Sequence, residues 1–175
     1  MTDLATTAGD AVVVPGIEPP SSLACLRSLS ARDVRTIVVS EDPGTPSFRS
    51  AYCDETVAAP VPEDDIAGYG DLLLDLASRS SVQTIIPVRE EDVHVLAHRK
   101  AEFAEHVATP WPDLDTLESV TDRERLFDAA EDASVVVPET RPLTEWDDWD
   151  RDTVIKSRYT VLVENNRASY PSVRY

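Results

Sequence analysis

The stretch "AVVVPGIEPPSSLACLRSLSARDVRTIVVS", from Ala11 to Ser40, decides the fold class. It begins with "AVVV" (Ala11 to Val14) and ends with "TIVVS" (Thr36 to Ser40), and both runs are apolar along almost their whole length. Continuous apolar runs of this length are typical of strands that are buried on both faces of a sheet. We therefore expect two buried strands joined by the segment between them.

The connecting segment is predicted to be a helix. Three leucines recur in it at helical spacing behind a serine that can act as the N-cap, Ser21 or Ser22: Leu23, Leu26 and Leu29. Two buried strands with a helix between them indicate a right-handed crossover in a parallel sheet.

The same alternation continues along the chain. A loop follows Ser40, and then come a weaker strand, a helix, a fourth strand and a helix rich in helix formers: Glu55–Pro60, Tyr69–Ser80, Gln83–Val88 and Glu90–His106. This order predicts an α/β fold, a Rossmann-like parallel sheet with helices on both faces.

Length and charge limit the functional classes. A chain of 175 residues suits one domain, or one domain and the beginning of another. The net charge of −17 argues against a nucleic-acid partner, because no basic excess is available to replace counterions. Lysine is nearly absent, and this acidic composition resembles that of proteins from salt-accumulating archaea. We expect a halophilic protein in preference to an ordinary acidic one.

The location is predicted from what the sequence lacks. No apolar run approaches the roughly 20 residues of a membrane span, and the N-terminus has no export signal. We therefore expect a cytoplasmic protein without a membrane partner, beginning with a disordered leader over residues 1–10. Cys25 and Cys53 have no metal-ligand spacing and are expected to be small buried side chains.

Familiar catalytic signatures are missing, and five glycines leave little room for a glycine-rich phosphate loop. His94 and His98 lie four residues apart and could bind a metal together with Glu91. Because no further ligand has convincing spacing, a solvated helix face is the preferred interpretation. The acidic "REEDV" (Arg89 to Val93) is interpreted as charge that favours a helix N-terminus.

One arginine stands at an unexpected place. In "SVTDRERLFDAAEDASVVVPET" (Ser119 to Thr140), Thr121 and Glu124 predict a capping box, which makes Arg123 the second residue of a helix. A cation there is disfavoured by the helix dipole, so we expect Arg123 to have another task. The flanking acids, Asp122 among them, can also offset the dipole cost, and this alternative stays open.

Lys156 is one of two lysines, with Lys100. In "DTVIKSRY", strand alternation would place Lys156 and Arg158 on one face and Ile155 on the other. A lysine on a strand is a rigidly placed point charge that suits a phosphate oxygen. The alternative is an ion pair with a nearby acid such as Asp152.

The ordered set of motifs resembles the ATP-grasp superfamily, in particular its carbamoyl-phosphate-synthase-like and carboxylate–amine ligase branches. The similar segments are "SLACLRSL", "FRSAYCDETVAAP" and "IIPVREEDVHVLA", followed by "TDRERLFDAAEDASVVVPET" and "TVIKSRY". The resemblance implies a pre-ATP-grasp Rossmann-like domain over 11–140 and an incomplete start of an ATP-grasp domain over 141–175. In that start, "TVIKS" and "YTVLV" are expected to be the first strands.

The resemblance also implies a function. Lys156 and Arg123 are expected to contact the phosphates of ATP, although Ser157 stands where the family has proline. A complete parent protein is expected to activate a small carboxylate or bicarbonate as an acyl phosphate and to join it to an amine. Its magnesium ligands and glycine-rich lid are expected beyond Tyr175, so little or no catalysis is expected from these 175 residues alone. Association into a homodimer is left open by the sequence.

A different class of function remains open at this point. The chain could be a non-catalytic Rossmann-like binding or interaction domain, in which Arg123 and Lys156 make surface ion pairs.

Overall fold

The computed structural model describes residues 10–15, 20–146 and 152–171. Its centre is a four-stranded parallel sheet in the order β3-β2-β1-β4. The strands are β1 (Ala11–Pro15), β2 (Arg35–Ser40), β3 (Glu55–Ala58) and β4 (Val82–Ile85). The predicted Rossmann-like parallel sheet is confirmed. Because β4 returns to the far side of β1, the strand order reverses there, and such switch points are where open α/β sheets bind ligands.

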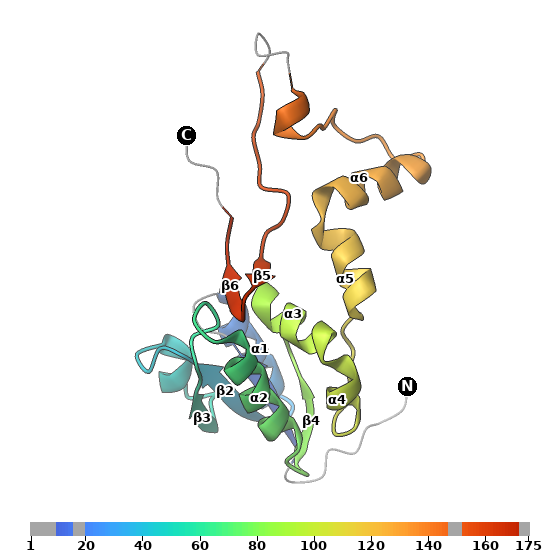
Figure 1. Cartoon of the computed structure of the whole chain (residues 1–175). Helices are drawn as coiled ribbons and strands as arrows, with labels where there is room; N and C mark the ends of the chain where they lie inside the picture. The colour runs from blue at the N-terminus through green and yellow to red at the C-terminus, as the bar shows by residue number, and fades with distance from the viewer. Residues whose placement is uncertain (1–9, 16–19, 147–151, 172–175) are drawn as a thin grey trace.

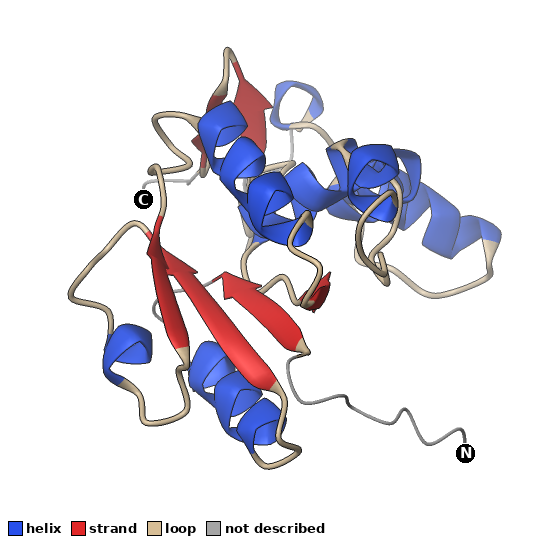
Figure 2. Cartoon of the chain, turned by 90° about the horizontal axis from the view of Figure 1, so that it is seen from below, coloured by secondary structure: helices blue, strands red, loops and turns tan. Residues whose placement is uncertain are grey.

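Helices cover both faces of the sheet (Figure 2). On one face, Val12, Val14 and Val38 pack against Leu26 of α1 (Pro20–Ser30). On the other face, the alternate side chains of the same strands pack against α2 (Ile66–Ala77), α3 (Glu90–His98) and α4 (Lys100–Ala104). The alternation of buried side chains to opposite faces explains why β1 and β2 are apolar at nearly every position.

Several predicted boundaries were wrong. Ser21 and Ser22 lie inside the first turn of α1, which already begins at Pro20, where the fixed φ of proline suits a first helical position. The fourth strand ends at Ile85, before Pro87, which lacks the N–H that a strand needs. The predicted long third helix is divided at Arg99, whose φ of −108° and ψ of 23° lie outside helical geometry.

After the sheet, two helices extend away from it (Figure 1): α5 (Leu114–Thr121) and α6 (Arg123–Asp132). Short 3₁₀ turns occur at Pro46–Arg49 and Leu143–Glu145. The chain then forms an antiparallel hairpin of β5 (Leu162–Glu164) and β6 (Arg167–Ser169). Asn165 and Asn166 form its turn with φ values of 52° and 62°, as a tight hairpin turn requires.

The expected strand over "TVIKS" is wrong. Residues 153–157 are extended but pair with no strand in the described part of the chain. The backbone N–H and C=O groups of a strand need a neighbouring strand as their hydrogen-bond partner. Here the segment makes backbone hydrogen bonds with the start of a helix instead, as described below. Of "YTVLV", only the last two residues belong to β5.

The hairpin is attached to the Rossmann-like sheet through the start of α2. The amide of Ile66 donates to the carbonyl of Asn166 (3.2 Å), and the Asn166 side chain accepts from the Ala67 amide (2.8 Å). Ala168 of β6 is 4% exposed and belongs to the main core cluster. The hairpin is thereby fixed beside the N-terminal end of α3 (Figure 1).

Other expectations have mixed outcomes. Cys25 and Cys53 are free and half-buried against the α1 side of the core, so they are less buried than predicted. The expected leader over 1–10 falls almost entirely outside the described residues. Within the described ranges, no helix combines the length and apolarity of a membrane span.

We predict that Asp92 is a main stabilising residue of this fold. Its fully buried carboxylate accepts from the Tyr69 hydroxyl (2.6 Å) and from the amides of Val88 (3.1 Å) and Arg89 (2.8 Å). Asp92→Ala leaves these donors unpaired and should lower the free energy of unfolding by about 3 kcal/mol. Chemical denaturation measures this loss, and Asp71→Ala, at an exposed ion pair with Arg99, should cost less than about 1 kcal/mol. Equal losses would contradict the assignment.

Candidate functional site

The site begins at the junction between α5 and α6. Asp122 is 3% exposed, caps α6 and accepts a hydrogen bond from the Glu124 amide (3.0 Å). The predicted capping box is therefore wrong: Thr121 ends α5, where its hydroxyl donates to the Leu117 carbonyl (2.9 Å). Arg123 is the first residue of α6, one position earlier than expected. The buried carboxylate lies next to the free amides of the helix and also offsets the helix dipole.

Asp122 also holds a distant segment of the chain. Arg158 donates to it through both sides of its guanidinium, from Nε to Oδ1 (2.8 Å) and from Nη2 to Oδ2 (2.6 Å). The Tyr159 hydroxyl adds a bond of 3.3 Å to Oδ2. We call the Asp122–Arg158 pair the latch. Its hydrogen bonds, foremost those from Arg158, lower the pKa of Asp122 to about 2.

Arg123 faces the same segment. Its amide donates to the Arg158 carbonyl (3.2 Å), and its Nη1 donates to the Ser157 carbonyl. The first amides of a helix have no partner within the helix, so the carbonyl of Arg158 satisfies one of them. Residues 157–158 are thus bound to the start of α6, which explains why this segment is extended without being part of a sheet.

Lys156 comes directly before this attachment. Exposure alternates as predicted, because Lys156 and Arg158 are exposed while Ile155 is half-buried. Lys156 makes no hydrogen bond or ion pair with any residue that the structure describes. The alternative prediction of an ion pair with Asp152 is therefore not met in this structure.

Arg123 and Lys156 line one cavity of about 1230 Å³, between α6, the chain after it and the segment before β5. The other two cations among its described lining residues are neutralised: Arg158 by the latch and by Glu124 (2.6 Å), and Arg141 by Glu139 (2.9 Å). Within the described ranges, neither Arg123 nor Lys156 has a carboxylate partner.

The same cavity carries many carboxylates. Six acidic side chains of the described residues line it: Glu124, Asp128, Glu131, Glu139, Glu145 and Asp152. A polyanion that binds here therefore needs additional positive charge to offset these acids, and a divalent cation is the usual companion of a nucleotide. In the parts of the chain that the structure describes, no group of three or more His, Cys, Asp or Glu side chains could hold a metal ion.

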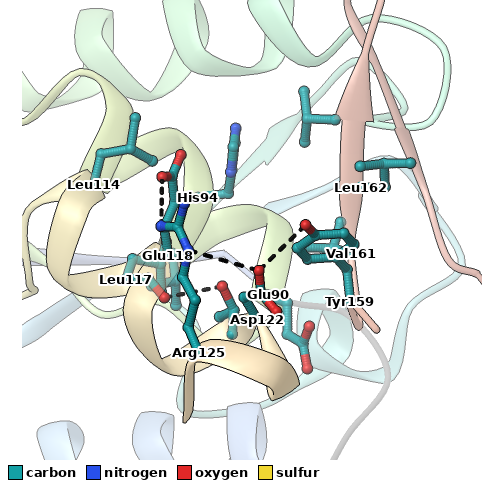
Figure 3. Close-up of a pocket in the computed structure, with 13 residues that line it drawn as sticks. Glu90, His94, Leu114, Leu117, Glu118, Asp122, Arg125, Tyr159, Val161 and Leu162 are labelled. Atoms are coloured by element: carbon teal, nitrogen blue, oxygen red, sulfur yellow. Dashed lines mark hydrogen bonds and ion pairs between the residues drawn. The ribbon is translucent and has the colours of Figure 1, made fainter. Parts of the chain in front are cut away.

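A second cavity, of about 420 Å³, adjoins the junction (Figure 3). Asp122 and Tyr159 line it, whereas their chain neighbours Arg123 and Arg158 line the larger cavity. The latch therefore stands between the two cavities. His94 of α3 also lines the smaller one.

The histidine pair differs from the prediction. His94 is half-buried and its ring stacks on that of His98, with 6.0 Å between the ring centroids, so the face is only partly solvated. Burial, and to a lesser extent His98, lowers the pKa of His94. Glu91, the third ligand considered, is 3% exposed and pairs with Arg89 (2.9 Å).

A buried polar cluster around Arg89 was missed in the sequence. Arg89 pairs with Glu41 (2.9 Å) at the end of β2 and with Asp92 (3.3 Å), and it lies over the Tyr69 ring. Burial raises the pKa of Glu91, which is also hydrogen-bonded to Tyr170. The only sequence signal was "REEDV" directly after a strand. Because acidic residues at a helix N-terminus account for that pattern, it did not indicate a buried cluster. The cluster ties the carboxyl edge of the sheet to the chain after β6.

Comparison with known proteins gives a structural relative. No protein-family model matches the chain, and no curated protein does. A solved structure described as "Biotin Carboxylase domain of single-chain bacterial carboxylase" is similar at a TM-score of 0.53 and 25% sequence identity. The match covers 75% of this chain and 30% of that one, so the chain spans less than a third of its relative. The similarity supports an ATP-grasp-related fold.

The latch predicts a particular acid sensitivity. Because the pKa of Asp122 is about 2 in the folded state and about 3.9 in an unfolded chain, its charge stabilises the fold above about pH 4, and this contribution is lost as the pH falls toward 2. Asn is as good a cap as Asp, so Asp122→Asn removes the charge and keeps the cap. The variant should lose about 1–2 kcal/mol of unfolding free energy at pH 7 and should converge with the wild type near pH 2.

Denaturation at several pH values measures this convergence. Asp128→Asn, at an exposed position of α6, is the control and should follow the wild type throughout. A constant difference between Asp122→Asn and the wild type from pH 7 to pH 2 would contradict the charged latch.

Proposed function

We propose that this chain is the N-terminal portion of an ATP-dependent ligase that joins a carboxylate, or bicarbonate, to an amine through an acyl phosphate. The observation that carries the proposal is the pair of cations, Arg123 and Lys156, that line one cavity without a carboxylate partner among the described residues. The similarity to the biotin carboxylase domain of a single-chain bacterial carboxylase supports ATP-dependent chemistry of this kind.

In the proposed reaction, a carboxylate oxygen attacks the γ-phosphorus of ATP, the bond from that phosphorus to the bridging oxygen breaks, and ADP leaves. The amine then attacks the acyl carbon and displaces phosphate. Arg123 and Lys156 act as electrostatic clamps on the phosphate oxygens, because negative charge must be stabilised where it develops. Arg123 cannot serve as an acid or base, since its guanidinium stays protonated.

The Asp122–Arg158 latch holds together the two segments that carry the cations of the proposed clamp. Lys156 lies two residues before Arg158, and Arg123 directly follows Asp122. The latch and the bonds from Arg123 to the Ser157 and Arg158 carbonyls therefore bind the two segments that carry the cations to each other. Preorganised charges of this kind need little rearrangement when the anion arrives.

Magnesium belongs to the proposal because the cavity is rich in acids. A bound Mg²⁺ would supply positive charge that offsets the phosphate oxygens and the nearby carboxylates. Its protein ligands and the lid are proposed to belong to a longer form of the protein, and the 175-residue chain is proposed to bind nucleotide without turning it over.

The alternative function, a non-catalytic Rossmann-like interaction domain, assigns Arg123 and Lys156 to surface ion pairs. No such pair occurs among the residues described, and Arg123 donates to a backbone carbonyl instead. This observation favours the ligase over the interaction domain.

Nucleotide binding tests the clamp. Titration calorimetry with ADP and Mg²⁺, at about 2 M KCl to screen the acidic surface, should show that Lys156→Ala and Arg123→Ala each weaken affinity by about tenfold, the value of one charge-assisted contact. Arg79→Ala, which removes a remote cation paired with Glu55, should leave the affinity unchanged. Unchanged affinity in both cavity variants would overturn the clamp.

A further inference from the structure

The smaller cavity next to the latch has walls that suit an apolar body. Leu114 and Leu117 of α5 lie on one side of it, and Val161 and Leu162 lie on the opposite side (Figure 3). These side chains are half-buried, and the volume of about 420 Å³ falls within the range of small-molecule sites. A compact apolar group of several carbon atoms can pack against these walls.

The charges around this cavity do not balance. Its carboxylates are Glu90, Glu118 and Asp122, and its one permanent cation among the described lining residues is Arg125. Asp122 is already neutralised by Arg158. Arg125 lies 3.8 Å from both Glu118 and Asp122, and its pair with Glu118 is exposed on both sides and therefore weak.

Glu90 has no partner at all among the residues that the structure describes. His94 adds no positive charge near neutral pH, because its burial lowers its pKa further below neutrality. The cavity thus combines apolar walls with an excess of negative charge, and it is separated by the latch from the cavity that holds Arg123 and Lys156.

We propose that this smaller cavity binds a small organic ammonium ion with an apolar body. The ammonium group lies by Glu90 and Glu118, and the body packs between the leucines and valines. Carboxylates of the same shape are disfavoured, because they would meet Glu90, Glu118 and Asp122, and the one cation among the described lining residues, Arg125, already lies between Glu118 and Asp122.

The site also has a place in the proposed reaction. Under the proposed ligase function, on which this part rests, the bound cation is the amine substrate, held on the other side of the latch from the phosphate clamp. The carboxylate to be activated then belongs with the cations of the larger cavity. The two cavities thereby differ in their cations: among the described lining residues, cations without a carboxylate partner occur in the larger cavity, whereas Arg125 of the smaller one lies beside Glu118 and Asp122.

The experiment uses three probes of equal shape on the full chain: cyclohexylamine, cyclohexanol and cyclohexanecarboxylate. Calorimetry, with NMR shifts to locate the site, should show cyclohexylamine binding at least tenfold more tightly than either of the others.

The double variant Glu90→Gln/Glu118→Gln should lose at least tenfold in affinity for cyclohexylamine. The matched control, Glu105→Gln/Asp115→Asn, removes the same net charge from exposed positions outside the cavity and should bind like the wild type.

Two results would overturn the inference: equal affinity for amine and carboxylate, or an equal loss in the control, which would reveal general attraction to the acidic surface. ADP titration of the same variants separates this inference from the ligase proposal. Absence of amine binding with intact, Lys156-dependent ADP binding would reject the amine site alone.

Discussion

The carboxylate of Asp122 meets three demands at one point in the molecule. It caps α6, it binds the guanidinium of Arg158 through both oxygens, and it accepts from the Tyr159 hydroxyl. A buried carboxylate is costly unless it is paired and hydrogen-bonded, and these contacts meet that condition. Because of them, the segment before β5 lies on a helix terminus and not in a sheet, and Lys156 lines the same cavity as Arg123.

The latch also separates two cavities that differ in their cations. On one side, the cations without carboxylate partners among the described residues line the larger cavity, and on the other side the smaller cavity carries an excess of carboxylate. The hairpin β5–β6 supports this arrangement from the opposite end, through its bonds to the start of α2 and through Tyr170 on the cluster around Arg89. The proposed phosphate site and the proposed ammonium site can therefore lie on the two sides of the latch.

The Rossmann-like sheet was predictable because each strand is a local apolar run followed by a helical pattern. The N-cap of α6 was not predictable. Thr121 and Asp122 are both good N-caps, and the contact with Arg158, 36 residues away, decides between them. The strand over "TVIKS" failed for a similar reason, since a strand exists only with a neighbour. Arg123 and Lys156 were expected to act together from the family resemblance, and both line one cavity. The cluster around Arg89, by contrast, joins elements that no local pattern connects.

The central claim is that Arg123 and Lys156 act on the same anion. A double-mutant cycle with Arg123→Ala, Lys156→Ala and the combined variant measures this directly through the affinity for ADP and Mg²⁺. Two cations that clamp one phosphate group should be coupled by more than about 0.5 kcal/mol, beyond the additivity expected of independent sites. Additive losses would mean that the two residues meet the nucleotide separately or only through long-range charge, and they would contradict the shared clamp.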